Sequence, residues 1–296
     1  MIDPKDAQSV EDLRPRLIGL AYRMLGSVAD AEDAVQDTLL KWSQIDSASI
    51  DNPGGWLTTA CTRRCIDMLR SAHRARVDYV GAWLPEPMQT SSDNPQAESD
   101  LDLAGSLTTA FLLMLERLTA RERAAYVLHD VFETPYAEIA QMLNIKETAC
   151  RQLVSRARRH VGRDKIRAAA PAARQDELLK AFRSALATGA TDGLAHLLAD
   201  DVRLSADGGG KVPAILNAVQ GKTEVIDFVA TALKRYWERL ECAEREINGA
   251  RGLVVGEKNS VHATVSFSFD ENGKANGIFI MRNPDKLSRF AAMTLQ

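Results

Sequence analysis

The sequence has little of what marks secreted and membrane proteins. Four cysteines among 296 residues are too few for a disulfide framework in a chain of this length. No apolar run approaches the roughly 20 residues that a membrane-spanning helix needs. The segment MIDPKDAQSV has neither a basic cluster nor an apolar core, so we expect no signal peptide. We therefore predict a cytoplasmic protein with no membrane contact.

Two of the cysteines, Cys61 and Cys65, are four residues apart and would share one face of a helix. Such a pair could bind a metal ion, but no matching Cys or His pair lies nearby in the sequence. We predict instead that both are small buried side chains. The sequence indicates no metal and no other cofactor.

The chain also lacks a large net charge, being formally −3 at pH 7, which taken alone argues against nucleic-acid binding. The charges are unevenly placed, however. Five arginines stand against one aspartate between Gly54 and Arg76, and eight lysines or arginines against two acids between Lys146 and Arg167. Two basic patches in an otherwise acidic chain indicate local contacts with phosphates.

Helical periodicity dominates the sequence up to about Ala170. Apolar residues between Leu13 and Leu25 follow the i, i+3, i+4, i+7 spacing of a helix with one buried face. A second helix starts after Gly26-Ser27. The run NPGG then breaks the chain before a basic helix over Trp56–Arg74.

A linker and a second group of helices follow. Residues 77–102 are rich in Pro, Ser and acids, which is typical of a linker. Thr119 and Glu122 form a capping box. Thr134 before Pro135 predicts an N-cap followed by proline at the first helical position.

From about Gln175 the pattern changes to mixed helices and strands. Apolar and polar residues alternate through VHATVSFSF (Val261–Phe269), which predicts a half-buried strand. Asn272-Gly273 indicates a hairpin turn, and GIFIM supplies the returning strand. We predict a multidomain chain in which two all-α domains precede an α+β domain. The expected boundaries are 1–76, 77–102 (linker), 103–168, 169–174 (short linker) and 175–296.

The segment TPYAEIAQMLNIKETACRQLVSRARRH has the spacing of a helix-turn-helix. Ile139, Ala140 and Leu143 give a short helix an apolar face, and Asn144 tolerates the left-handed geometry of a tight turn. The second helix would bury Cys150, Leu153, Val154 and Ala157 and expose a polar face that can contact base edges and phosphates. That face carries Thr148, Arg151, Gln152, Ser155, Arg156 and Arg159. An ordinary helical hairpin with a solvated basic face is the alternative.

The basic helix after NPGG suits a different task. Trp56 and a row of arginines could follow a phosphate backbone or an opened strand. Taken alone, a solvated amphipathic helix explains the segment equally well.

Together, LRPRLIGLAYRMLGSVADAEDAVQDTLLKW, WLTTACTRRCIDMLRS and the helix-turn-helix resemble, in order, regions two and four of the extracytoplasmic-function (ECF) sigma factors. The resemblance implies binding to core RNA polymerase, through the β′ coiled coil and the β flap, and to promoter DNA, without catalysis. The positions that match the polymerase-binding helix are Asp30, Asp33, Gln36, Asp37 and Lys41.

The resemblance also implies which residues contact the promoter. In region two, which opens the −10 element and captures an unstacked base, the matching residues are Asn52, Trp56, Arg63, Arg64, Asp67, Arg70 and Arg74. Asp67, Arg70 and Arg74 could instead form a structural charge network. In region four the helix-turn-helix face contacts the −35 element, with Arg151, Gln152, Ser155 and Arg156 as leading contacts.

The α+β part resembles a SnoaL-like domain of the NTF2-like superfamily, which a subgroup of these sigma factors carries. Three motifs tie the chain to that subgroup: WLPEP (Trp83, Leu84, Pro85, Glu86, Pro87), DGGGK (Asp207, Gly208, Gly209, Gly210, Lys211) and NPDKL (Asn283, Pro284, Asp285, Lys286, Leu287). We hypothesise one regulatory contact zone in which the fused domain holds the linker and sets the spacing of the two DNA-reading domains. Three unrelated loops are the alternative.

Three other interpretations stay open. SnoaL-like domains include enzymes, and His196, Asp200, Asp201 and His262 are candidate acids and bases, although no oriented pair is visible in the sequence. The domain could also bind a small ligand in a cone lined by Trp237, Phe267, Phe269, Phe279 and Met281, which core packing explains equally well. A one-component helix-turn-helix regulator with a ligand-binding domain is the rival architecture.

Overall fold

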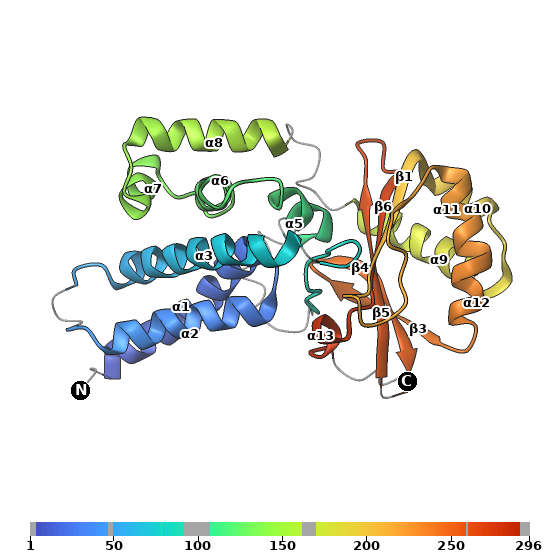
Figure 1. Cartoon of the computed structure of the whole chain (residues 1–296), viewed down its shortest axis with the longest axis horizontal. Helices are drawn as coiled ribbons and strands as arrows, with labels where there is room; N and C mark the ends of the chain where they lie inside the picture. The colour runs from blue at the N-terminus through green and yellow to red at the C-terminus, as the bar shows by residue number, and fades with distance from the viewer. Residues whose placement is uncertain are drawn as a thin grey trace. The chain divides into compact units, whose positions relative to one another are not determined.

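A computed structural model describes residues 4–46, 50–77, 79–90, 107–161, 170–258 and 260–290. The chain forms two compact units (Figure 1). We call Met1–Val77 with Met114–Arg163 the helical unit, and Asp78–Leu113 with Asp164–Gln296 the sheet unit. The predicted class, two all-α domains followed by an α+β domain, is confirmed.

The first part of the helical unit is formed by α1 (Pro4–Leu25), α2 (Val28–Ser43) and α3 (Pro53–Val77). The predicted apolar stripe of α1 is buried, with Leu17, Leu20 and Met24 at most 2% exposed. Helix α3 starts earlier than expected, at Pro53. The reason is local: the Asn52 side chain accepts a hydrogen bond from the Gly55 amide (2.9 Å), and proline fits the first helical turn.

The second part contains α6 (Ala120–Tyr126), the π-helical segment η3 (Val127–Val131), α7 (Tyr136–Leu143) and α8 (Glu147–Val161). The predicted capping box of Thr119 and Glu122 is confirmed. The predicted N-cap of α7 is wrong by one residue. Pro135 is the cap, because the Thr134 amide bonds back to the Leu128 carbonyl (2.9 Å) and keeps Thr134 in the preceding turn.

A buried arginine joins the two parts of the helical unit. Arg123 of α6 is 2% exposed. Its guanidinium donates to the Met24 carbonyl of α1 (2.7 Å), to the Leu115 carbonyl (2.9 Å) and to the Glu116 carboxylate (2.8 Å). A buried charge is stable only when it is paired and hydrogen-bonded in this way, so Arg123 specifies how α1 and α6 meet.

The sheet unit contains a sheet which, in the described residues, has six strands in the order β2-β1-β6-β5-β4-β3, with β1 and β6 parallel and the other neighbours antiparallel. The strands are β1 (Leu198–Asp207), β2 (Val219–Gln220), β3 (Glu241–Ile247), β4 (Ala250–Glu257), β5 (Ser260–Phe269) and β6 (Ala275–Met281). The helical elements are α5 (Thr109–Leu115, its last two residues in the helical unit), α9 (Ala172–Thr188), α10 (Asp192–Leu197), α11 (Lys222–Phe228), the π-helical η4 (Val229–Leu233), α12 (Lys234–Trp237) and α13 (Pro284–Leu287).

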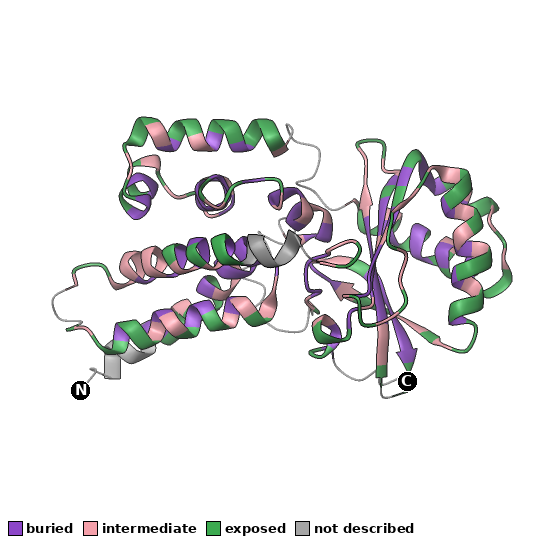
Figure 2. Ribbon diagram, in the orientation of Figure 1, coloured by how far each residue is buried: buried purple, intermediate pink, exposed green. Residues whose placement is uncertain are grey.

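The main core of this unit lies between one face of the sheet and α9–α12 (Figures 1 and 2). Phe182 of α9 meets Phe267 of β5 edge-on, with 5.4 Å between ring centroids. The predicted hairpin at Asn272-Gly273 is confirmed, since Gly273 has φ +72° and β5 pairs with β6 on either side of it. No helix in the described residues is long and apolar enough to span a membrane.

Strand β5 differs from the expectation of a half-buried strand, because both of its faces are covered. The polar residues Thr264 and Ser266 are 2% and 8% exposed. The Ser266 hydroxyl lies 2.9 Å from the Thr109 hydroxyl of α5. Residues from before α9 therefore cover the second face of the sheet, which the alternation of β5 alone did not reveal.

Candidate functional site

Helix α8 presents the predicted polar face to solvent. Thr148, Arg151, Gln152, Ser155, Arg156 and Arg159 are all exposed, while Cys150, Val154 and Ala157 are buried on the opposite side. Asn144 has φ +51°, which confirms the left-handed turn between α7 and α8. The helix-turn-helix geometry is therefore present, with its polar face available to a partner.

Two of the leading arginines are held by neighbouring side chains. Arg151 forms an ion pair with Glu147 (2.6 Å) and lies over the Tyr136 ring (4.4 Å to its centroid). Arg156 lies 3.7 Å from the Glu122 carboxylate. Burial raises the pKa of Glu122, but hydrogen bonds from Thr119 and the charges of His160 and Arg156 outweigh it and lower that pKa. These contacts orient the arginines before any partner binds.

The matching residues on α3 fall into two groups. Asn52, Arg63, Asp67 and Arg70 are exposed, and Asp67 pairs loosely with Arg70 (3.6 Å). Trp56 is half-buried against Trp42 of α2, with 5.4 Å between ring centroids, and Arg64 pairs with Asp37 (2.8 Å). The side chain of Arg74 lies outside the described residues.

A groove separates α3 from α7 within the helical unit. The Arg63 guanidinium crosses it and donates to the Met142 carbonyl (2.8 Å). The groove has a volume of about 600 Å³ and is lined by Asn52, Gly55, Trp56, Thr59, Ala60, Arg63, Glu138, Gln141 and Met142. The structure thus brings three predicted −10 residues against the first helix of the helix-turn-helix, which the sequence did not indicate.

Helix α2 carries the predicted polymerase-binding residues on one side. Asp33, Gln36 and Lys41 are exposed, and Asp30 and Asp37 are half-buried. Sequence reasoning missed Leu40, which is 53% exposed between them. The signal was its spacing, because Leu40 lies seven residues after Asp33 and four after Gln36 and so shares their helix face.

In the sheet unit, Asp207 joins the linker to the end of the sheet. Its carboxylate is fully buried and accepts hydrogen bonds from the Tyr79 hydroxyl (2.6 Å), the Leu84 amide (2.9 Å) and the Gly209 amide (2.9 Å). Its ion-pair partner is Lys286, at 2.8 Å. One buried carboxylate thereby holds the WLPEP, DGGGK and NPDKL segments together.

Lys286 and Asn283 complete these contacts. The Lys286 ammonium also donates to the Leu84 carbonyl (2.6 Å) and lies over the Tyr79 and Trp83 rings (5.1 and 4.5 Å). The Asn283 amide donates to the Tyr79 hydroxyl (2.9 Å). We call Tyr79, Leu84, Asp207, Asn283 and Lys286 the linker clasp. Tyr79 lies outside all three motifs, and for that reason sequence reasoning missed it.

The remaining motif residues differ in their surroundings. Leu84, Pro85, Glu86, Pro87 and Leu287 are buried, and Leu84, Leu287 and Met281 form a small apolar cluster. Gly209 has φ +62°, and a Cβ there would collide with the Asn283 side chain, so glycine is required. Lys211 and Asp285 form an exposed pair (2.5 Å), with Pro284 and Gly210 also exposed.

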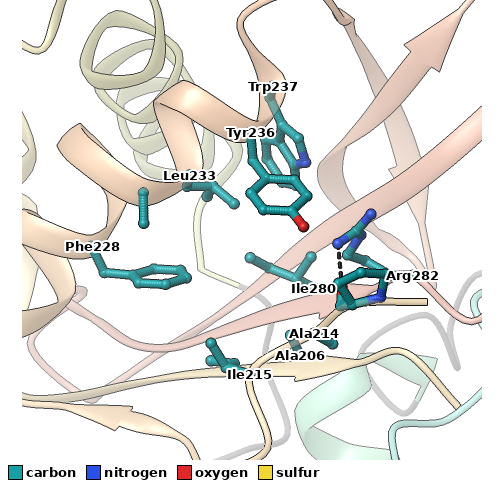
Figure 3. A pocket seen from close by; sticks show the side chains of 11 residues that line it. Ala206, Ala214, Ile215, Phe228, Leu233, Tyr236, Trp237, Ile280 and Arg282 are labelled. Carbon is teal, nitrogen blue, oxygen red and sulfur yellow. Dashed lines mark hydrogen bonds between the residues drawn. The ribbon is translucent and has the colours of Figure 1, made fainter. Parts of the chain in front are cut away.

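The helix-covered side of the sheet has a partly open cavity of about 240 Å³ (Figure 3). It is lined by Ala206, Pro213, Ala214, Ile215, Phe228, Ala232, Leu233, Tyr236, Trp237, Ile280 and Arg282. Of the five residues suggested for a ligand cone, only Trp237 lines it. Phe267 belongs to the core. Phe279 and Met281 pack with Leu84 on the other face, because alternate residues of β6 point to opposite sides.

The four candidate acids and bases lie away from this cavity. His196, Asp200, Asp201 and His262 are absent from the lining of this cavity. Asp200 pairs with Lys222 at the surface (2.5 Å), and the hydrogen bond and charge of Lys222 lower the pKa of Asp200. Cys61 and Cys65 are fully buried, and no group of three metal-ligating side chains occurs in the described part of the chain.

Two family models match the chain. Residues 9–75 match Sigma-70 region 2, and residues 108–161 match Sigma-70, region 4. The chain is similar to the ECF RNA polymerase sigma factor SigJ of Mycobacterium tuberculosis, with 35% identity over 292 residues that cover 96% of this chain and 93% of the relative. The probable ECF sigma factor SigI of the same species is 28% identical, with 94% and 93% covered.

A solved structure agrees with these matches. The crystal structure of the M. tuberculosis ECF sigma factor SigJ matches the fold with a TM-score of 0.76 and 32% identity, covering 97% of this chain and 98% of that chain. The likeness therefore extends over the helical and sheet units alike.

Proposed function

Because the chain belongs to the ECF sigma factors of RNA polymerase, we propose that α3 and α8 contact the −10 and −35 elements of its promoters, under control of the fused sheet unit. The chain acts stoichiometrically in the cytoplasm, where it binds core polymerase and catalyses no reaction itself. The observation that carries the regulatory part is the buried Asp207, which holds the linker against the sheet.

Promoter contact through α8 is supported by its exposed polar face. Arg151, Gln152, Ser155 and Arg156 contact base edges of the −35 element, and Thr148 and Arg159 hold the flanking phosphates. Arginine and glutamine suit this task because their side chains form paired hydrogen bonds with base edges in the major groove.

Contact with the −10 element falls to Asn52, Trp56 and Arg63, since these side chains lie around one groove. Arg64, which pairs with Asp37, and Arg70, which pairs with Asp67, support that surface and reach phosphates. Because Arg63 donates to the Met142 carbonyl, α3 must separate from α7 before Arg63 can contact an opened strand.

Core polymerase binds the exposed side of α2. Asp33, Gln36 and Lys41 supply charge and hydrogen bonds to the β′ coiled coil, and the exposed Leu40 supplies an apolar anchor. The β flap is the second contact, through the part of the chain that matches region four.

The linker clasp regulates the sigma factor through chain connectivity. The linker joins α3 to α5, so fixing residues 79–90 constrains the segment between the two DNA-contacting halves. A clasped linker and a released linker therefore allow different separations of α3 and α8, and promoter activity differs between the two states.

The test compares two matched double variants. Asp207→Asn with Lys286→Met removes the buried ion pair of the clasp, whereas Lys211→Gln with Asp285→Asn removes the exposed pair nearby. Each purified variant is mixed with core polymerase, and open-complex formation is measured on the upstream region of its own gene.

We expect a several-fold change in open complexes for the clasp variant and none for the control. Circular dichroism and binding to core polymerase verify that the helical unit is intact. Equal activity of both variants and the unaltered chain would show that the clasp has no regulatory role. Specific promoter binding by the chain alone, with no gain from core polymerase, would favour a one-component regulator instead.

A further inference from the structure

The cavity in the sheet unit has the size and lining of a small-ligand site. At about 240 Å³ it exceeds the roughly 150 Å³ of an engineered apolar cavity that binds benzene. Its described lining is apolar apart from Arg282, the Tyr236 hydroxyl and the Trp237 indole N–H. Figure 3 shows the Phe228 ring at one end and the Arg282 guanidinium beside the Tyr236 hydroxyl at the other. The cavity is thus apolar at the Phe228 end and polar at the Arg282 end.

Arg282 is held by its neighbours but keeps a buried donor without a partner. Its guanidinium donates to the Pro213 carbonyl and lies 5.3 Å from the centre of the Tyr236 ring. Its Nε is buried and has no hydrogen-bond partner among the described residues. A buried unpaired donor is unfavourable unless something absent from the isolated chain accepts from it.

The charge of the lining indicates the chemical class of that acceptor. Arg282 is the only charged residue among those described as lining the cavity. One guanidinium balances a monoanion, and its geometry matches a carboxylate, whereas a phosphate dianion would leave a charge unbalanced in an apolar site. We propose that the cavity binds a small organic carboxylate whose apolar body, a ring or a short chain, extends towards Phe228.

The cavity is directly connected to the linker clasp, and this part of the inference depends on the proposed regulatory function. Ala206 and Arg282 line the cavity, and the next residue after each, Asp207 and Asn283, belongs to the clasp. The Arg282 amide donates to the Asp207 carbonyl (2.7 Å). A carboxylate that draws Arg282 into the cavity therefore shifts the clasp, provided that its affinity differs between the clasped and released states.

Calorimetric titration of the full-length chain tests the site. The probes are octanoate and phenylacetate, each compared with its neutral amide of the same shape. Arg282→Gln removes the charge, Ala232→Leu fills part of the cavity from an exposed position, and Arg235→Gln removes an arginine of α12 that does not line the cavity.

We expect at least one acid to bind at least ten-fold more tightly than its amide. Arg282→Gln removes that preference, Ala232→Leu weakens binding of acid and amide alike, and Arg235→Gln changes neither. If neither acid binds, if acid and amide bind equally, or if both cavity variants bind like the unaltered chain, the proposal is wrong. If Arg282→Gln does not fold, the acid-to-amide ratio and Ala232→Leu still decide.

The titration contains no polymerase, so its outcome is independent of the clasp experiment. If no acid binds but the clasp variant changes open-complex formation, only the ligand site is overturned. If an acid binds but the clasp variant has no effect on open complexes, the ligand site stands and its link to regulation is overturned. With both active, saturating octanoate or phenylacetate should change open-complex formation by the unaltered chain and leave Arg282→Gln unaffected.

Discussion

Asp207 accepts hydrogen bonds from the linker, from its own glycine loop and from Lys286, with no exposed surface of its own. A buried carboxylate is tolerated only while its charge is paired and its lone pairs are satisfied. Asp207 therefore differs in its burial from Asp285, which belongs to a neighbouring motif but forms an exposed pair with Lys211.

The two aspartates should differ in their contribution to stability. Asp207→Ala removes the counter-ion of the half-buried Lys286 ammonium and the acceptor of three further hydrogen bonds, and should lower the free energy of unfolding by about 3–5 kcal/mol. Asp285→Ala breaks a surface pair and should cost at most about 1 kcal/mol. Urea denaturation followed by circular dichroism compares them. Equal losses would mean that the buried pair contributes no more to stability than the surface pair.

Tyr79 gives the clasp a dependence on alkaline pH. Burial, and then the hydrogen bond to Asp207, raise the pKa of the Tyr79 phenol, so folding favours the protonated form. The contribution of Tyr79 is complete below its ordinary pKa of about 10 and falls as the pH rises above it. Unfolding free energies between pH 8 and 11 should therefore decline less for Tyr79→Phe than for the unaltered chain; parallel declines would contradict the assignment.

At the scale of elements, the features that depend only on nearby residues were predicted correctly. The Thr119–Glu122 capping box, the left-handed Asn144 and the exposed face of α8 follow from residues within one or two turns. The covered second face of β5 did not, because α5 and the linker that cover it are distant in sequence. The same cause misplaced the cavity lining on β6: Phe279 and Met281 are apolar, yet they face the linker side.

Substitutions on helix α8 should show whether its arginines contact bases or phosphates. Arg151→Ala and Arg156→Ala should each weaken binding of the holoenzyme to its −35 element by about 1–3 kcal/mol, the range for a bidentate base contact. Arg121→Ala, which removes an exposed arginine of α6, serves as the matched control. Filter binding on the promoter and on a scrambled −35 sequence provides the measurement. An equal loss on both DNAs would assign these arginines to phosphate.

Binding of helix α2 to core polymerase should depend on its one exposed leucine. Leu40→Ala should weaken binding to core polymerase by about 1 kcal/mol or more, because an apolar anchor loses its buried contact. Leu216→Ala removes a comparably exposed leucine of the sheet unit and should have no effect. Competition against unaltered sigma factor for core polymerase measures both, and indistinguishable affinities would remove Leu40 from the interface.

At the scale of the whole molecule, two internal contacts restrain segments that the proposed function requires to move. The Arg63 contact with Met142 closes the groove between α3 and α7, and the clasp holds the linker against the sheet. The sigma factor is therefore expected to work by releasing internal contacts when polymerase and DNA replace them, which is a population shift rather than a new fold.

Locking the groove should separate polymerase binding from promoter opening. A bismaleimide cross-link between Thr59→Cys and Glu138→Cys, which line the groove, should leave core binding intact and abolish open complexes. Each single variant treated with the same reagent controls for reaction at native cysteines. Full activity of the cross-linked chain would mean that the groove need not open.

The most direct test of the sigma assignment is start-site selection in a purified system. The chain is added to core polymerase on the upstream region of its own gene, and transcripts are mapped at their 5′ ends. We expect a stable complex with the core and a defined start site that appears only when both are present. Failure to associate with the core, or transcripts unchanged from those of core alone, would contradict it.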